Sequence, residues 1–323
     1  MADTQRLVRL LEPTTAVKVM DIPENDSVKD IERYITSRVE SLPVGRVAIL
    51  RKSNASFLWV RMVMDELENV YSAESITHVL RDIPSGMVPY YERIVKAMGE
   101  NKLEKHITVA VLTWVVGSSR RITLSELSQA LTLDINTVLP NPKSAIEGLC
   151  GQLVKIHSSG TVDLVHATAR EFLLRPTAGE FIISTPVAHK RIAMACLKLF
   201  SSREMQPPRN HRLMPQPRPR AEPSPLLDYA ITQLFEHVHG ASIETDELLL
   251  ALDRFFKTNV LSWVERLAGK GDLDCLVQAS RNLKSYLDRR VKHSSPLSDP
   301  ENNLAKWSTD LSRLVTKFGE ALL

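Results

Sequence analysis

The sequence contains little cysteine and no long apolar run, and each shortage excludes a class of protein. Its three cysteines, Cys150, Cys196 and Cys275, are far apart in the chain, so we expect neither a disulfide framework nor the paired cysteines of a zinc site. The longest apolar stretch, at 107–116, has about half the length that a membrane-spanning helix needs. The first residues show no apolar signal-peptide core. These absences predict a reduced, cytoplasmic protein that does not enter a membrane.

Net charge is small as well. Lys and Arg together number 41 against 38 for Asp and Glu, which gives a formal charge of +3 over 323 residues. Overall charge therefore gives no reason to expect a nucleic acid or an anionic membrane as a partner. The length and the 43% hydrophobic content are ordinary for a globular chain of two or three small domains.

Catalytic and ligand-binding motifs are missing too. No Gly-x-x-x-x-Gly-Lys-Ser/Thr loop occurs, since "AGKGD" at 268–272 has the wrong spacing, and there is no Gly-x-Ser-x-Gly elbow. His237 and His239 are one residue apart, point to different faces of a helix and have no Cys or acidic motif beside them. We interpret them as a solvated helix end. The sequence thus predicts no enzyme activity, no cofactor, no metal and no small-molecule substrate.

The first hundred residues carry mostly helical patterns. Residues 14–22 have β-branched side chains at alternating positions and predict a buried strand. Ser27, with Asp30 three positions later, predicts the start of a helix that ends near Pro43. From Ser56 the apolar residues recur at three and four and predict an interior helix, and two further helices follow at about 73–81 and from Met87.

The next segment has the pattern of a winged-helix domain. A helix is expected to bury Leu103, Ile107 and Trp114 on one face. Thr123 and Glu126 then form a capping-box pattern, with Ile122 and Leu127 as a hydrophobic staple. A third helix at about 143–152, a β-hairpin around "SSG" and a closing helix complete the pattern.

The remaining chain predicts a helical bundle interrupted by one loop. A helix opens at Pro186, and residues 201–225 concentrate seven prolines and five arginines, which is typical of an exposed linker. Amphipathic patterns then predict five helices, at about 226–239, 245–256, 258–268, 272–290 and 301–322.

Several stretches, in this order, resemble the fungal NACHT-type members of the signal-transducing NTPase (STAND) class. They are "DIERYITSRVESLP", "SNASFLWVRMVMDEL", "VLRDIPSGMVPYYERIV", "LTWVVGSSRRITLSELSQALTL", "LCGQLVKI" and "VDLVHATAREFLL", and the later helices are similar to the connector that precedes ankyrin or WD-type repeats. The core motif positions of this resemblance are Phe57, Trp59, Leu149 and Phe172. The resemblance implies that the chain begins within the end of the NTPase domain and stops before the repeats.

Together these patterns predict a mainly α protein with four parts. They are a remnant of the NTPase domain at 1–45 with a short N-terminal strand, a helical subdomain at 46–100, a winged-helix domain with a small β-hairpin at 101–176, and a C-terminal helical connector at 177–323. A lone strand at 14–22 would leave Val17, Val19 and Met20 with an open edge. We therefore expect a protein partner or self-association.

His166, in "LVHATAREFLL", is the most informative single residue. From the residues alone, an imidazole beside apolar side chains is most simply a structural group. The resemblance implies another role, because in related switches a histidine at this hairpin-to-helix junction donates a hydrogen bond to the β-phosphate of ADP. Without a phosphate-binding loop in the sequence, that role is vestigial here or depends on another chain.

A winged helix also raises nucleic-acid binding as the alternative function. The charges oppose it, since residues 117–175 contain six cations and five carboxylates, and the expected wing has an Asp and no Lys or Arg. A third hypothesis is that the chain is part of an NTPase whose missing elements are supplied by another chain. The leading hypothesis is a non-enzymatic regulatory or protein-interaction fragment of a NACHT-type switch protein.

Overall fold

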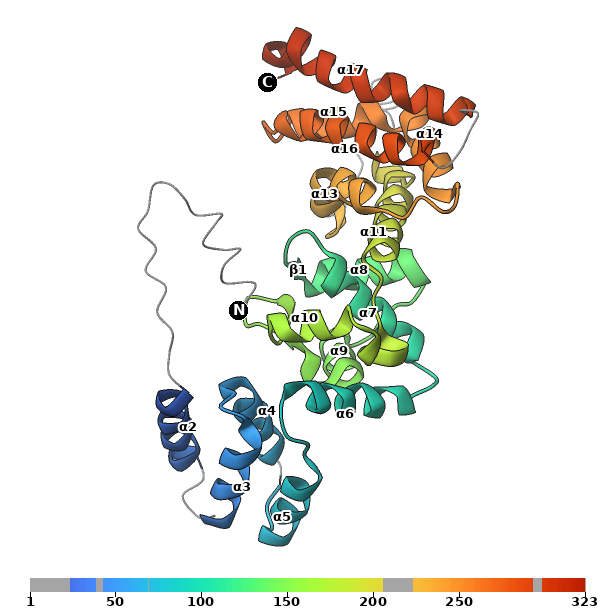
Figure 1. The fold of residues 1–323 in the computed structure, drawn as a ribbon. Coiled ribbons are helices and arrows are strands. Elements are labelled where there is room, and N and C mark those ends of the chain that lie inside the picture. The colour runs from blue at the N-terminus through green and yellow to red at the C-terminus, as the bar shows by residue number, and fades with distance from the viewer. Residues whose placement is uncertain (1–23, 39–42, 69, 206–222, 293–297, 323) are drawn as a thin grey trace. The chain divides into compact units, whose positions relative to one another are not determined.

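The computed structural model describes residues 24–38, 43–68, 70–205, 223–292 and 298–322 (Figure 1). Within them are 15 α-helices and one three-stranded antiparallel sheet, so the fold is mainly helical, as predicted. The strand expected at 14–22, with Val17, Val19 and Met20, lies outside the described residues. In the described part of the chain, no helix is both long enough and apolar enough to span a bilayer.

The chain divides into two compact units, Met1–Tyr90 and Tyr91–Leu323. Within the first unit lie α2 (Glu24–Arg38), α3 (Pro43–Ser53), α4 (Phe57–Leu67) and α5 (Ala73–Asp82), followed by the start of α6 (Met87–Glu100). Its core contains Ile31, Ile35, Ile49 and Trp59, and the indole N–H of Trp59 donates to Pro84 O at 3.1 Å. The Lys52 ammonium donates to Leu80 O and Ile83 O and so satisfies carbonyls at the end of α5.

Two predictions for the first unit were wrong, and one helix was missed. Ser27, expected to start a helix, lies inside α2, which begins at Glu24, and α3 was not predicted at all. Phe57, predicted as a core position, is 47% exposed, because it is the first residue of α4 and lies at the edge of the helix's buried face. Its ring still contacts Tyr34 at 4.9 Å between centroids. Trp59, two positions later, is fully buried, as predicted.

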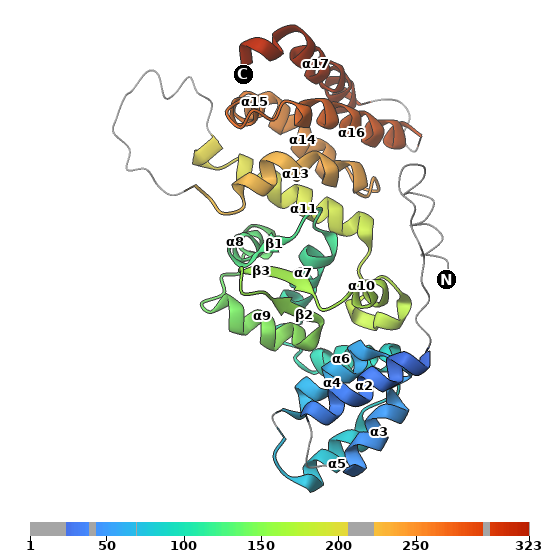
Figure 2. The ribbon, with the colours of Figure 1, turned by 90° about the vertical axis from the view of Figure 1, so that its left-hand side faces the viewer.

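The winged-helix domain is present in the second unit. It consists of α7 (Lys105–Gly117), β1 (Ile122–Thr123), α8 (Leu124–Ile135), α9 (Pro142–Cys150), β2 (Val154–Ile156), β3 (Thr161–Leu164) and α10 (Ala167–Leu173). The predicted hairpin pairs Val154 with Leu164, and β1 adds a third strand through Ile122 and Val162, in the order β1-β3-β2. Figure 2 shows this sheet beside α8 and α9. Leu103 was predicted to be buried but precedes α7 and is 84% exposed.

The predicted capping box at the start of α8 is confirmed. The Thr123 side chain accepts from the Glu126 backbone N–H at 3.2 Å, and the Glu126 carboxylate accepts from the Thr123 backbone N–H at 2.7 Å. Ile122 and Leu127, the expected staple residues, are both buried. Two donors that a helix start leaves without partners are thereby satisfied.

The C-terminal helices follow the sequence pattern closely. After η2 (Pro176–Phe181) come α11 (Thr185–Phe200), with a proline in its first turn, and η3 (Arg203–Met205). The later helices are α13 (Leu227–Gly240), α14 (Glu247–Thr258), α15 (Val260–Ala268), α16 (Asp274–Val291) and α17 (Asp299–Leu322). Helix α11 packs against both α7 and α13, so it joins the winged-helix domain to the C-terminal helices (Figure 2). Residues 206–222 of the predicted linker lie outside the described residues.

Candidate functional site at the junction of the winged helix and the C-terminal helices

His166 is the N-cap of α10 and is exposed. Its Nδ1 atom accepts a hydrogen bond from the Thr168 backbone N–H at 3.2 Å and lies 3.0 Å from Thr168 Oγ1. The Thr168 hydroxyl in turn lies 3.0 Å from the hydroxyl of Tyr91. Since Nδ1 accepts from the backbone, the proton of the neutral ring is on Nε2. The geometry gives His166 a local structural task, and its role as a phosphate sensor stays a prediction.

Two of the remaining core motif positions are also buried. Leu149 on α9 and Phe172 on α10 are each less than one-tenth exposed. The Phe172 ring packs against the ring of Tyr91, with centroids 5.4 Å apart. These positions therefore define the core of the winged helix.

The residue that sequence reasoning misjudged most is His237 on α13. It was predicted to belong to a solvated helix end, yet it is fully buried. Its Nδ1 lies 2.8 Å from Nδ1 of His189 on α11, and its Nε2 lies 2.7 Å from the hydroxyl of Tyr229 and 3.3 Å from that of Ser119. The Ser119 backbone N–H donates to the Tyr229 hydroxyl at 3.1 Å. We call these four residues the histidine relay.

The histidine relay connects three parts of the second unit. Ser119 belongs to the turn between α7 and β1, His189 to α11, and Tyr229 and His237 to α13. Burial lowers the pKa of His237 to about 3, and the neighbouring His189 adds to that effect. Burial is also the main cause that lowers the pKa of His189. Both rings are therefore neutral at pH 7, one donating and the other accepting across the Nδ1–Nδ1 contact.

Two glycines allow the helices to approach this closely. A Cβ atom on Gly240, the last residue of α13, would lie 2.6 to 2.9 Å from atoms of the His189 ring. A Cβ atom on Gly117, the last residue of α7, would lie 2.9 Å from Cδ1 of Ile192 and 3.1 Å from Cβ of Ala188. These distances are shorter than ordinary contacts, so a larger residue at either position would require its neighbours to shift.

A second polar link joins the winged helix to α11. Asp134, near the end of α8, accepts from the indole N–H of Trp114 at 3.1 Å and from Arg191 Nε at 2.7 Å. The Asp134 side chain is only 7% exposed, so this is a largely desolvated, charge-assisted interaction. It fixes α7, α8 and α11 relative to one another beside the histidine relay.

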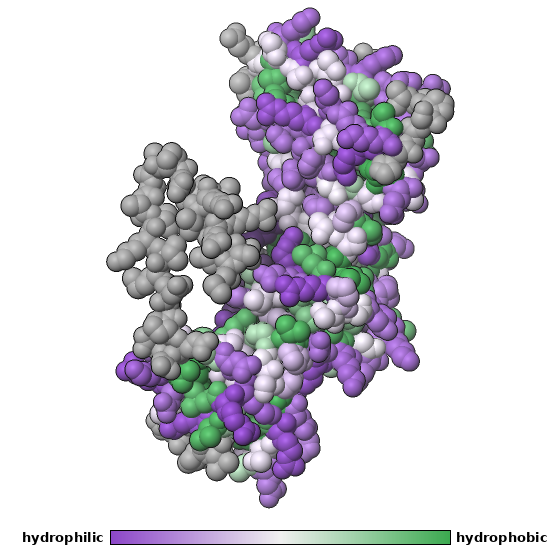
Figure 3. Space-filling view, viewed as in Figure 1, coloured by the Kyte–Doolittle hydropathy of each residue, from purple (hydrophilic) through white to green (hydrophobic). Residues whose placement is uncertain are grey.

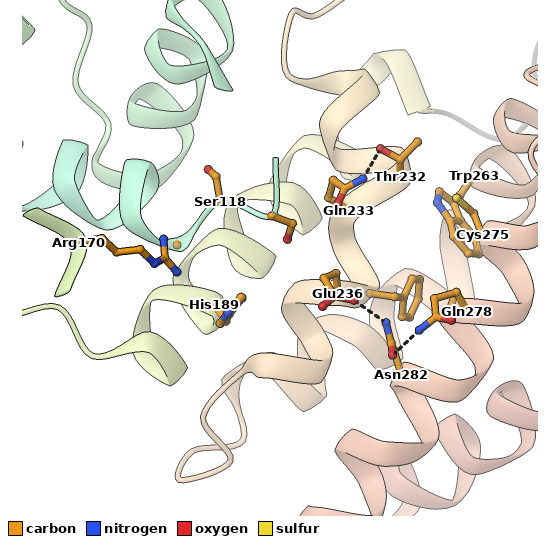
Figure 4. A pocket seen from close by; sticks show the side chains of 14 residues that line it. Ser118, Arg170, His189, Thr232, Gln233, Glu236, Trp263, Cys275, Gln278 and Asn282 are labelled. Carbon is orange, nitrogen blue, oxygen red and sulfur yellow. Dashed lines mark hydrogen bonds between the residues drawn. The ribbon is translucent and has the colours of Figure 1, made fainter. Parts of the chain in front are cut away.

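A cavity of about 540 Å³ lies along this junction (Figure 4). Its wall includes the end of α7, Arg170 of α10 and His189 of α11. The other side is formed by α13 and α16, which contribute Glu236 and Asn282. Sequence reasoning did not find this cavity. Arg170 is exposed, as predicted, and its guanidinium also donates to Val116 O at the end of α7.

The surface expected for DNA binding carries few unpaired cations. Lys143 of α9 and Lys155 of β2 are exposed. Arg121 pairs with Asp163 at 3.0 Å, and Arg120 pairs with Glu126 at 2.6 Å. The outward residues of α9 also include Ser144, Glu147 and Gly148, which lack the long donor side chains that read base edges.

Side chains for metal binding do not converge in the described residues. No group of three His, Cys, Asp or Glu side chains there could hold a metal ion. Burial raises the pKa of both Cys150 and Cys196 to about 12, so these thiols pack in the core as protonated groups. That outcome matches the packing role predicted for Cys150.

Comparison with known families gives one match. Residues 92–184 match the family model described as GPI inositol-deacylase, winged helix domain. That family contains NACHT domains, so the match identifies a NACHT-associated winged-helix region. The matched segment begins within α6, ends after η2 and includes α7 to α10, the part of the chain that forms the winged helix. No curated protein and no solved structure matches the chain.

Proposed function

We propose that this chain is a non-enzymatic regulatory and protein-interaction region of a NACHT-type switch protein. Its winged helix would serve as a structural element that connects the signalling part of such a protein to the C-terminal helices. The match of residues 92–184 to a NACHT-associated winged helix supports this assignment. The family name describes a deacylase, but the matched model covers the winged helix alone, so the proposal takes nothing from the enzyme activity.

The observation that carries the proposal is that the arginines near the wing form ion pairs within the domain and so are not left unpaired for phosphate. The Arg120 and Arg121 guanidinium groups are paired with carboxylates of the same domain, and Lys143 and Lys155 are the cations left exposed on α9 and β2. A DNA reader needs several unpaired cations on this side, because phosphate contacts supply most of its affinity. A winged helix without them is better suited to packing against protein.

The packing of the second unit also favours a mechanical role. The histidine relay and the Asp134 interaction connect α7 and α8 of the winged helix to α11 and α13 with buried polar contacts. Buried polar contacts are specific in geometry, because a shift would leave their atoms without partners. A displacement of the winged helix would therefore be passed on to the C-terminal helices.

Light scattering over a range of protein concentrations tests the interaction role. The proposal predicts that the molar mass rises with concentration up to tens of micromolar, or that the mass rises when a binding protein is added. A constant monomer mass over the whole range would count against self-association. Figure 3 shows apolar residues in separate small groups on one face of the described residues, so through this face we expect weak, reversible association rather than a permanent dimer.

A further inference from the structure

We propose that the cavity between the winged helix and the C-terminal helices binds an extended polypeptide segment that carries one acidic and one basic side chain. This inference deepens the proposed interaction role and rests on it. The cavity has a positive end at Arg170 and a negative end at Glu236, and His189 lies between them (Figure 4). A ligand that fits both ends must carry both charges.

The positive end is the Arg170 guanidinium. Among the residues that the structure describes, its hydrogen-bond partner is Val116 O, to which Nη1 donates. A guanidinium has five N–H donors in a planar arrangement, so most of them remain for a ligand. Their geometry suits a carboxylate, which can accept two parallel hydrogen bonds. Ser118 and Ser119 lie on the same wall and add hydroxyl groups.

The negative end is the Glu236 carboxylate on α13. Its Oε2 atom accepts from Asn282 Nδ2 at 3.2 Å, and within the described part of the chain no cation pairs with it. The Asn282 amide is buried and also accepts from Gln278 Nε2 at 3.1 Å, so it holds the carboxylate in place. An unpaired, positioned carboxylate favours an ammonium or guanidinium group of a ligand.

Both charges lie close enough to His189 to affect its pKa. Burial lowers the pKa of His189 most; the negative charge of Glu236 acts in the opposite direction, and the positive charge of Arg170 lowers the pKa further. His189 thus experiences opposite fields from the two ends of the cavity. A ligand with matching charges would neutralise both ends at once.

The polar lining of the cavity suits a peptide backbone. Gln233 and Gln278 both line it, and each side-chain amide has an acceptor oxygen as well as donor hydrogens. Backbone N–H and C=O groups need partners of both kinds when they leave water. A volume of about 540 Å³ lies within the usual range for ligand sites, roughly 300–1,000 Å³.

The same geometry disfavours simpler occupants. A small anion at Arg170 would leave Glu236 without a partner and would be repelled by it, and a nucleic-acid phosphate has the same charge. A small cation at Glu236 would likewise leave Arg170 without a partner and would be repelled by it. In an extended segment, side chains two positions apart lie on the same side, so an acidic and a basic residue at that spacing would both face the cavity.

The test is titration calorimetry of the whole chain with blocked tripeptides. The probes are acetyl-Asp-Gly-Lys-amide and acetyl-Lys-Gly-Asp-amide, because the direction of the bound segment is not fixed, with Asp-Gly-Asp and Lys-Gly-Lys versions as references. We expect one of the mixed peptides to bind at least about tenfold more tightly than both references. Equal binding of all four peptides, or binding of none, would overturn the proposal.

Matched variants locate the site. Arg170→Gln and Glu236→Gln should each weaken binding of the mixed peptide by about tenfold, because each removes one charged partner. Arg175→Gln and Glu265→Gln change exposed residues of the same types outside the cavity lining and should bind like the native chain. Unchanged affinity in the first two variants would contradict the site. DNA binding, tested separately, would overturn the proposed function without altering this result.

Discussion

The Nδ1 atom of His189 lies 2.8 Å from the Nδ1 atom of His237, inside the junction of α11 and α13. One of the two Nδ1 atoms must carry a hydrogen and donate it, and the other must be unprotonated to accept it. Protonation of both Nδ1 atoms would break this hydrogen bond. Through His237 Nε2 the contact continues to Tyr229 and to Ser119 at the edge of the winged helix. The stability of this junction should therefore depend on protonation.

The stability of the protein should fall on acidification because of His237. Its folded-state pKa is lowered to about 3, whereas an exposed histidine in the unfolded chain has a pKa near 6.5. A neutral His237 thus contributes fully above about pH 6.5, and its contribution is lost as the pH falls from there toward 3, since the unfolded chain takes up the proton first. Urea unfolding at several pH values should show a decrease of up to about 1.4 kcal/mol per pH unit from this group.

A His237→Gln variant provides the control for this pH dependence. It should be less stable than the native chain at pH 7, because the relay loses its connection. The difference between the two proteins should shrink between pH 6.5 and 4.5, since only the native chain loses the neutral histidine's contribution. Parallel stability curves for the two proteins would show that His237 does not control the acid response. The groups that surround the pair, Glu236, Arg170 and His239, are unchanged in this comparison.

Gly240→Ala should destabilise the fold by about 1–3 kcal/mol, because the new methyl group overlaps the His189 ring, which its bond to His237 holds in place. Gly148→Ala is the matched control. Its Cβ meets no atom within 4 Å, and the position lies within α9, so alanine there should stabilise by about 0.5–1 kcal/mol. Chemical denaturation measures both changes. Equal effects of the two substitutions would contradict the close approach of α13 to α11.

Thr123→Ala should cost about 1 kcal/mol of stability, because it removes one side of the capping box of α8. Burial opposes ionisation of Glu126, but hydrogen bonds from Arg120 and Thr123 outweigh it and lower the pKa of the carboxyl group. Its contribution is therefore present at neutral pH and is lost as the pH falls through that lowered pKa. Ser144→Ala, on the exposed face of α9, should leave stability nearly unchanged in the same denaturation assay.

The chain alone should not bind ADP. Its sequence contains no phosphate-binding loop, and the Nδ1 of His166 is already used to cap α10. Calorimetric titration with ADP and Mg²⁺ should give no binding heat for the native chain or for His166→Ala. Binding by the native chain that disappears in His166→Ala would instead support a nucleotide site that retains the sensor role implied by the family resemblance.

Local patterns in the sequence predicted most of the fold. Amphipathic spacing located the C-terminal helices within a few residues, and the Thr123 and Glu126 pair identified the start of α8 correctly. These features depend on neighbours within one or two turns, which a sequence shows directly. Helix α3 was missed, because Val47 points outward while Ile49 is buried, which obscures an apolar stripe.

The site could not be predicted in the same way. His237 has the local context of a helix end, and only its contact with His189, 48 residues earlier, makes it a buried group. The cavity likewise depends on residues from Gly117 to Asn282. Gly240 after the two histidines was the one local signal, since glycine permits a close approach, but its partner is not visible in the sequence.

The most direct test of the central claim is the binding of a fluorescently labelled DNA duplex, measured by anisotropy at about 50 and 200 mM salt. A protein-interaction role predicts no saturable, salt-sensitive binding at either concentration, and no change in Lys143→Ala combined with Lys155→Ala. Saturable binding that weakens steeply with salt and is lost in that double variant would show that the winged helix reads nucleic acid and would contradict the account.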